Sequence, residues 1–323
     1  MHRRKKRSRI NPVLILASVL IFITGAGIFV YPAVSNYLAE RRQAEAVRDY
    51  QRDVSSLEPQ DLSEQKARAQ EYNKNLAEDE FHDPFLQDGK YVISPAYQKV
   101  LDYNEEGIMG YVEIPDIDVN LPIYHGTGEE ALRKGAGHLE ASSLPIGGEG
   151  THSVISAHRG LPSAKLFSDL DELEIGDVFF IHILNETHAY QVDQINVVKP
   201  DELDILRVVN GQDLVTLLTC TPYAVNTHRL LVRGVRIPYE EAESVREAVR
   251  GGNPLSGWVK EYAASVLAGL ALLVLLTLSA IAWKRRKDPG VGRLRSKDSV
   301  KTKPGRIERG HRKREQKRRK YRE

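Results

Sequence analysis

The sequence predicts a mainly β domain, a barrel or a sandwich, set between two membrane-spanning helices. Short strand-like runs, separated by Gly, Pro and Asn, recur between residues 106 and 238. Two uncharged runs of about 20 residues, the length needed to cross a bilayer, flank this region. A cluster of Lys and Arg lies next to each run, on the side away from the β domain.

Charge is segregated along the chain. Residues 1–9 carry six Lys and Arg and no acid, and residues 284–323 carry nineteen Lys and Arg against five acids. Residues 10–283 hold 21 basic and 39 acidic residues. An acidic body between two basic ends predicts that the chain occupies two compartments, and not that it carries one basic binding surface.

The predicted transmembrane helices are residues 10–31 and residues 258–283, the second containing an uncharged run from Ala263 to Trp283. Because Lys and Arg are retained on the cytoplasmic side, we expect a two-pass protein in the cell membrane, with both termini inside and the body outside. The first run, with the small residues around Ala33, also fits a cleaved signal peptide. The acidic body is exported under either interpretation.

The segments around the body differ in composition. Residues 32–80 have apolar positions at helical spacing and predict an extracellular helical segment, without a sustained heptad. Residues 239–257 predict a C-terminal helix or linker. Residues 284–323 contain few apolar residues and predict a disordered cytoplasmic tail. We expect this tail to lie on anionic lipid headgroups and not to bind nucleic acid.

The body itself divides into a turn-rich loop and lead-in at residues 81–103 and a β domain at residues 104–238. Within it we expect seven strands, at residues 111–114, 121–124, 153–157, 178–183, 189–198, 213–220 and 229–237. Short helices are expected at residues 94–101, 129–134, 164–170 and 240–250.

Cys220 is the single cysteine of the chain, and it ends the strand predicted at residues 213–220. A lone exported cysteine forms no internal disulfide, so it is a small buried residue, an intermolecular link or a reactive thiol. The thiolate is the reactive form, and a free thiol with a pKa of about 8.5 needs a nearby base or cation. The chemistry this allows is acyl transfer, with no indication of the substrate.

His158 and Arg229 are the best partners for this thiol. His158 follows the strand predicted at residues 153–157, and catalytic groups commonly lie on loops at strand ends. An imidazole can pair with the thiolate and later protonate a leaving amine, and a guanidinium can stabilise an oxyanion. Arg229 begins the strand after Cys220, with Arg233 as its competitor on the same face; His125 and His138 are the alternative histidines.

We expect neither a cofactor nor a metal ion in this body. The exported histidines show no spacing that further metal ligands support.

These residues resemble the sortase family. Residues 216–220 read Thr-Leu-Leu-Thr-Cys, which fits the sortase signature TLxTC, and His158, Cys220 and Arg229 follow in the order of the sortase triad. The runs 150–162 and 221–234 continue the similarity, which is greatest to the class C, pilus-assembling sortases. Asp83-Pro84-Phe85 resembles the lid of that class, although the aromatic residue there is more often Trp.

The resemblance implies an eight-stranded sortase β-barrel with short helices, and a lid whose aromatic side chain covers the catalytic cysteine while its acid lies near the catalytic arginine. It also implies the reaction. Cys220 would cleave an LPxTG-like sorting signal between Thr and Gly, and a lysine of the next pilin subunit would resolve the thioacyl-enzyme, which polymerises pilins on a Gram-positive cell surface.

Three alternatives remain open. A sortase of another class would anchor proteins to peptidoglycan. A membrane-bound cysteine protease would transfer the acyl group to water. A membrane-tethered scaffold or adhesin would need no reactive thiol at all.

Overall fold

The computed structural model describes residues 12–76, 81–86, 94–103 and 106–250, together with residues 267, 269 and 271. The chain divides into two compact units, residues 1–262 and 263–323, and the first of them contains the barrel. The second predicted membrane helix and the basic tail lie outside the described residues, apart from three helical positions at 267, 269 and 271.

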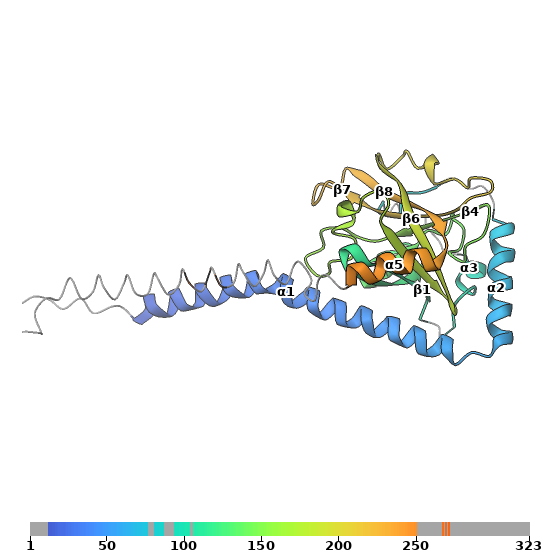
Figure 1. The fold of residues 1–323 in the computed structure, drawn as a ribbon. Helices are drawn as coiled ribbons and strands as arrows, with labels where there is room; N and C mark the ends of the chain where they lie inside the picture. The colour runs from blue at the N-terminus through green and yellow to red at the C-terminus, as the bar shows by residue number, and fades with distance from the viewer. Residues whose placement is uncertain are drawn as a thin grey trace, which may run out of the picture. The chain divides into compact units, whose positions relative to one another are not determined.

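Eight strands form a closed barrel in the order β1-β2-β3-β4-β7-β8-β6-β5. Figure 1 shows the barrel and labels β1, β4, β6, β7 and β8. The strands are β1 Ile108–Ile114, β2 Val119–His125, β3 Ala136–His138, β4 Thr151–Ser156, β5 Val178–Ile183, β6 Glu186–Val198, β7 Asp213–Thr221 and β8 His228–Ile237. Neighbouring strands are antiparallel except for two parallel pairs, β2 with β3 and β4 with β7. The predicted eight-stranded barrel is therefore confirmed.

Short helices and turns connect the strands. They are α3 Pro95–Gln98, η1 Pro115–Ile117, α4 Glu129–Lys134, η2 Leu170–Glu172, η3 Asp204–Leu206 and α5 Tyr239–Arg250. The helices expected at residues 129–134 and 240–250 are confirmed. The helix expected at residues 94–101 is present as the shorter α3.

The prediction of a helix at residues 164–170 is wrong. This segment turns instead, because the Phe167 N–H donates to the carbonyl of His158 (3.1 Å) and Leu166 has a positive φ of 46°. The three-residue strand β3 was not predicted, since it is too short to show an alternating pattern.

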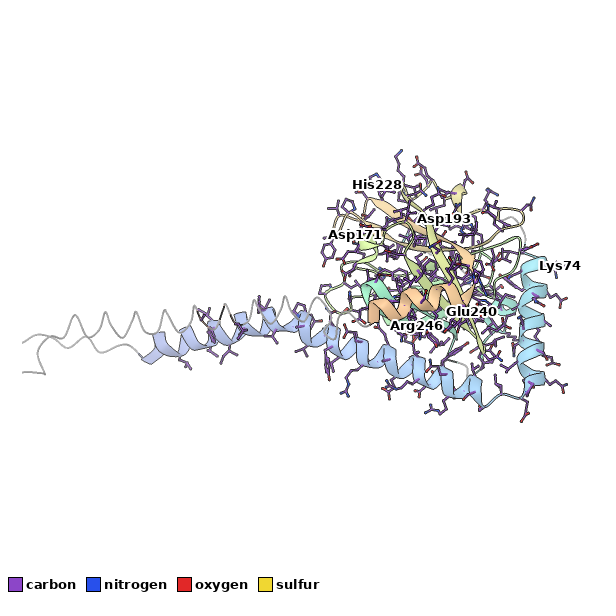
Figure 2. All side chains as sticks on the ribbon, viewed as in Figure 1. Lys74, Asp171, Asp193, His228, Glu240 and Arg246 are labelled. Atoms are coloured by element: carbon purple, nitrogen blue, oxygen red, sulfur yellow. The ribbon has the colours of Figure 1, made fainter. Side chains whose placement is uncertain are left out.

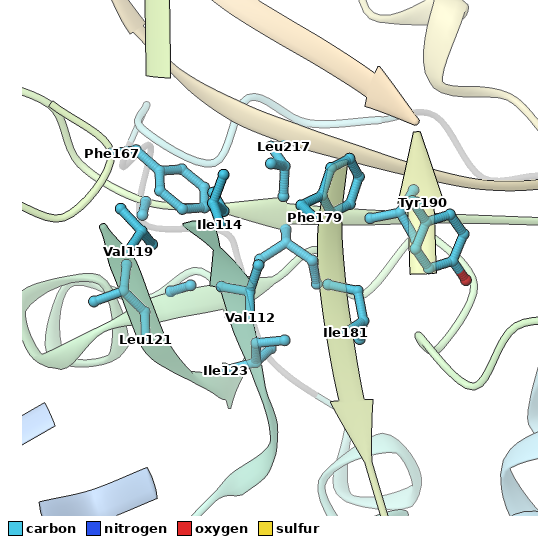
Figure 3. Packing of buried hydrophobic residues seen from close by; sticks show 14 of the residues in the cluster. Val112, Ile114, Val119, Leu121, Ile123, Phe167, Phe179, Ile181, Tyr190 and Leu217 are labelled. Carbon is cyan, nitrogen blue, oxygen red and sulfur yellow. The ribbon is translucent and has the colours of Figure 1, made fainter. Parts of the chain in front are cut away.

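The barrel interior is filled by alternating residues of the strands. Figure 3 shows Val112, Ile181 and Leu217 among this packing, and all three are fully buried. Phe179 and Tyr190 stack with their ring centroids 5.6 Å apart. With period two, the residues between these inward positions face out of the barrel, and Cys220 belongs to that outward set on β7.

Helix α1 extends from Pro12 to Ser55, and α2 follows at Pro59–Lys74; Figure 2 shows their side chains beside those of the barrel. Within the described ranges, α1 is the one helix long and apolar enough to cross a membrane, and its apolar stretch is not buried in the fold. Its last turns are fixed to the barrel. The Tyr50 hydroxyl donates to the carbonyl of Met109 (3.1 Å) and accepts from the N–H of Leu184 (2.8 Å).

Candidate active site

The parallel pairing of β4 with β7 places His158 and Cys220 at the same end of the barrel. The two segments remain hydrogen-bonded beyond the last residue pair of the β4–β7 ladder. The Ala157 N–H donates to the carbonyl of Leu218 (3.1 Å), and the Thr219 hydroxyl donates to the carbonyl of Ala157 (2.7 Å). Ala157, the residue before His158, is thus hydrogen-bonded through both its N–H and its carbonyl to the strand that presents Cys220.

Cys220 and Arg229 are direct partners in the antiparallel pairing of β7 with β8. Directly opposite residues in such a pair have Cβ atoms about 5 Å apart and share a face of the sheet. The connecting turn is closed by two N–H groups, of Val225 and Asn226, that both donate to the carbonyl of Pro222 (3.0 Å each). The pairing brings a thiol and a guanidinium together without any ligand.

The guanidinium of Arg229 is buried and fully engaged. It forms a two-point ion pair with Asp83, with Nε 3.0 Å from Oδ1 and Nη2 2.6 Å from Oδ2. Its Nη1 donates to the carbonyls of Asn226 (3.0 Å) and His228 (2.9 Å). The Arg229 and Asp83 side chains are 3% and 2% exposed, so the pair is desolvated.

Residues 81–86 lie across this end of the barrel. The Phe85 ring centroid is 5.3 Å from Cζ of Arg229 and 5.3 Å from the ring centroid of His158. The Asp83 carboxylate also accepts from the N–H of Phe85 (2.9 Å), which fixes the turn, and Pro84 is buried. One short segment therefore contacts two of the three predicted catalytic residues.

Phe81 and Phe85 pack on an outer apolar cluster, which is distinct from the barrel interior. Its buried members come from β4, β7, β8 and the loops beside them: Leu139, Val154, Leu203, Leu206, Leu218 and Leu231. Sequence reasoning missed this cluster. The signal was available, because β7 and β8 are apolar on both faces near Cys220, as a strand buried on both sides would be.

Burial disfavours the charged forms of the thiol and the imidazole. It raises the pKa of the Cys220 thiol to about 11; the Arg229 guanidinium lowers that pKa and the Asp83 carboxylate raises it. Burial also lowers the pKa of His158, against the opposing effect of Glu129. Cys220 is only 6% exposed. In this arrangement the neutral thiol and neutral imidazole are favoured over the reactive ion pair.

The alternative candidates have structural partners instead. Arg233 forms a two-point ion pair with Asp193, with Nε 3.0 Å from Oδ1 and Nη2 2.6 Å from Oδ2, on the β6 side of the barrel. Both ring nitrogens of His125 contact backbone carbonyls, and those of His138 contact the Tyr97 hydroxyl and the carbonyl of Ser143. The ring nitrogens of both histidines thus contact groups of the fold other than Cys220.

The ring of His158 contacts the ring of Phe85. Within the described ranges, no group of three His, Cys, Asp or Glu residues is placed to hold a metal ion. The thiol, the imidazole and the guanidinium of this arrangement are groups that can perform nucleophilic and acid–base chemistry.

Comparison with known proteins agrees with this geometry. The model of the sortase domain matches residues 112–237. Sortase C-1 from Streptococcus pneumoniae is 49% identical, with a TM-score of 0.58 over 60% of this chain and 99% of that chain. The chain belongs to the sortase family. As a sortase, it is a cysteine transpeptidase.

Two further relatives locate this sortase within its family. The pilus-related sortase C of Group B Streptococcus is 47% identical, with a TM-score of 0.57 over 60% of this chain and 98% of that chain. Sortase A from Bacillus anthracis is 24% identical over 68% of this chain and 92% of that protein. This sortase is thus more similar in sequence to the solved sortase C structures than to that sortase A.

Proposed function

We propose that this sortase is a membrane-anchored transpeptidase that joins pilin subunits through Cys220, with His158 and Arg229 as its catalytic partners. The observation that carries the proposal is the pairing of Cys220 with Arg229 across β7 and β8, with His158 at the adjoining end of β4. The similarity to sortase C structures, one of them described as pilus-related, favours pilin substrates.

The first half of the reaction forms a thioester. Once residues 81–86 withdraw, neutral His158 takes the proton of the Cys220 thiol. The resulting thiolate attacks the carbonyl carbon of the Thr–Gly bond in an LPxTG-like sorting signal, and the carbonyl oxygen becomes an oxyanion. The bond to the Gly nitrogen then breaks, and protonated His158 gives its proton to the departing amine. The product is a thioacyl-enzyme and a free Gly amine.

The second half transfers the acyl group. A lysine amine of the next pilin subunit attacks the thioester carbonyl, neutral His158 accepts its proton, and the thiolate of Cys220 leaves. The new bond is an isopeptide bond between the Thr carbonyl and the lysine nitrogen. No cofactor takes part, because each proton and electron pair is accounted for by the thiol, the imidazole and the two substrates.

Arg229 supplies the permanent positive charge of the site. A guanidinium stays protonated throughout the cycle and presents several N–H donors in one plane. When Asp83 withdraws, Nε and Nη2 of Arg229 are released to stabilise the thiolate or the developing oxyanion. The two carbonyl contacts of Nη1 keep the group in position meanwhile.

Residues Asp83, Pro84 and Phe85 act as a lid in this proposal. In the closed arrangement Asp83 occupies the guanidinium and Phe85 covers the imidazole. Opening the lid would expose the outer apolar cluster as a surface for the apolar part of the sorting signal. Access to Cys220 would then limit turnover as much as thiol reactivity does.

The membrane arrangement is also part of the proposal. The unburied apolar stretch of α1 supports anchoring near the N-terminus. The uncharged run at residues 263–283, with basic clusters outside both runs, supports a second span, an extracellular barrel and cytoplasmic termini.

The test is peptide transfer by the full chain in detergent. The protein is incubated with an LPxTG peptide, alone and with a lysine-containing pilin peptide or a peptidoglycan stem peptide, and products are identified by mass spectrometry. We expect an isopeptide product with the pilin lysine that is absent in Cys220→Ala. Hydrolysis alone would indicate a protease, and selective transfer to the stem peptide would indicate cell-wall anchoring.

A further inference from the structure

Arg159, the residue after His158, connects three segments around the site. Its Nε donates to the carbonyl of Ser168 (3.1 Å), its Nη1 to the hydroxyl of Thr221 (3.1 Å), and its Nη2 to the carboxylate of Asp171. All three guanidinium nitrogens are used. The side chain is 8% exposed, although it carries a full charge and lies on a loop.

The partners of Arg159 are informative because of where they lie in the chain. Thr221 directly follows Cys220 on β7, while Ser168 and Asp171 belong to the segment after the His158 loop, which ends in η2. The same segment binds the His158 backbone, because the Phe167 N–H donates to the His158 carbonyl (3.1 Å). One guanidinium therefore links the loop of the histidine to the strand end of the cysteine.

Tyr223 reinforces this link from the β7–β8 turn. Its ring centroid lies 5.9 Å from Cζ of Arg159, within cation–π range. Its ring also covers Gly160, where an added Cβ would come within 3.2 Å of ring carbons and where φ is +76°. A side chain at residue 160 would strain the backbone and displace this ring, so glycine allows the two loops to touch.

The imidazole of His158 depends on this backbone for its placement. The ring contact of this imidazole is with Phe85 of residues 81–86, and the carboxylate of Glu129 acts on it through its charge. When those residues withdraw, that contact is lost. The position of the imidazole relative to the thiol is then set by the loop, and hence by the groups that fix the loop.

We propose that Arg159 is a positioning residue for the transpeptidase reaction: its bridge to Thr221 fixes the His158 loop against the strand end that carries Cys220. This inference rests on the proposed roles of Cys220 and His158. It assigns Arg159 no contact with the substrate. Its effect is on the geometry of proton transfer, where a displacement of about 1 Å costs about 10²-fold in rate.

The test compares two matched arginine variants in the peptide-transfer assay. Arg159→Lys keeps the charge but cannot reach three acceptors from one ammonium group. Arg233→Lys makes the same change in the pair with Asp193, away from the His158 loop. We expect kcat to fall about tenfold to 10²-fold in Arg159→Lys with KM little changed, and neither to change in Arg233→Lys.

The partner hydroxyl gives a second, milder perturbation. Thr221→Val keeps the shape of the side chain and removes the acceptor, whereas Thr221→Ser keeps the acceptor. We expect Thr221→Val to lower kcat and Thr221→Ser to preserve it. The double variant of Arg159→Lys with Thr221→Val should lose no more than the larger single loss, because both break the same bridge.

The outcomes separate this inference from the proposed function. If the unmodified protein forms no amide product, the proposed function fails and the arginine comparison is made on the rate of thioester formation. If the unmodified protein is active but Arg159→Lys matches Arg233→Lys, or if the losses in the double variant multiply, the positioning role is wrong. A lowered melting temperature together with a raised KM would indicate a purely structural role.

Discussion

Two arginines of β8 form the same kind of ion pair in different surroundings. Arg229 pairs with Asp83 at 2.6 Å, with side chains 3% and 2% exposed. Arg233 pairs with Asp193 at 2.6 Å, with side chains 21% and 31% exposed. Asp193 lies on β6, which pairs with β8 in the barrel, whereas Asp83 lies outside the barrel strands, 146 residues from Arg229.

The difference identifies which pair can act as a switch. The ion pair of Arg233 joins two strands that are already hydrogen-bonded to each other, so breaking it would neither expose nor cover a site. The pair of Arg229 holds a separate segment against the strand partner of Cys220, and its burial makes each charge dependent on the other. In the proposed function, moving the segment exchanges one partner of the buried guanidinium for another, the substrate oxyanion.

Loss of Cys220 or of His158 gives the largest expected effect on activity. Cys220→Ala and His158→Ala should lower peptide-transfer activity by about 10⁴-fold or more, because each removes a group to which the proposed mechanism assigns a part in both half-reactions. His228→Ala is the matched control, since this neighbouring imidazole contacts Thr227. The measurement is the initial rate of amide formation. Activity in Cys220→Ala would contradict the assigned nucleophile.

Exchanging the buried arginine comes next. Arg229→Lys should lower kcat by about 10²–10³-fold, because an ammonium cannot reproduce the planar donors that the proposed mechanism assigns to the oxyanion. Arg233→Lys should leave kcat unchanged. Equal losses in the two variants, measured by steady-state kinetics, would show that β8 arginines act through stability alone.

Removing the aromatic cover gives a smaller effect. Phe85→Ala loses part of a half-buried aromatic contact, about 1.4 kcal/mol, which corresponds to about tenfold more of the open form. We therefore expect Cys220 to react about tenfold faster with a small thiol reagent. Phe85→Trp should keep the cover and slow labelling again. An unchanged rate in Phe85→Ala would argue against a covering role.

The smallest effect is expected at the partly exposed ion pair of Arg233 with Asp193. Asp193→Asn should lower the free energy of unfolding by less than about 1 kcal/mol, because partly exposed ion pairs contribute little. Urea titration of the full chain in detergent measures this change. A loss of several kcal/mol would remove the contrast between the two ion pairs of β8.

The barrel was predictable because its strands carry their own signals. The strand expected at residues 178–183 coincides with β5, and those at 213–220 and 229–237 match β7 and β8 to within a residue. Pro222 and Asn226 indicated the turn between β7 and β8. Period-two alternation also placed Arg229 and Arg233 on one face, but it did not distinguish them; their partners, Asp83 and Asp193, did so.

Contacts between distant segments could not be predicted from local patterns. The pairing of Asp83 with Arg229 was expected only from the resemblance to the class C lid, because composition and spacing around Asp83 do not indicate how the loop crosses the barrel. Arg159 is a similar case, because its bridge to Thr221 follows from the parallel pairing of β4 with β7. The false helix at residues 164–170 has the same origin: a tertiary bond to His158 outweighed local helical preference.

The most direct test of the switch is the labelling rate of Cys220 as a function of pH in Asp83→Asn and Asp193→Asn. Asp83 raises the pKa of the Cys220 thiol, so its neutralisation lowers that pKa, frees Arg229 and releases the segment. We predict labelling about 10²-fold faster at neutral pH, with the midpoint moved to lower pH, in Asp83→Asn alone. Identical rates and midpoints in the unmodified protein and Asp83→Asn would contradict a switch at this ion pair.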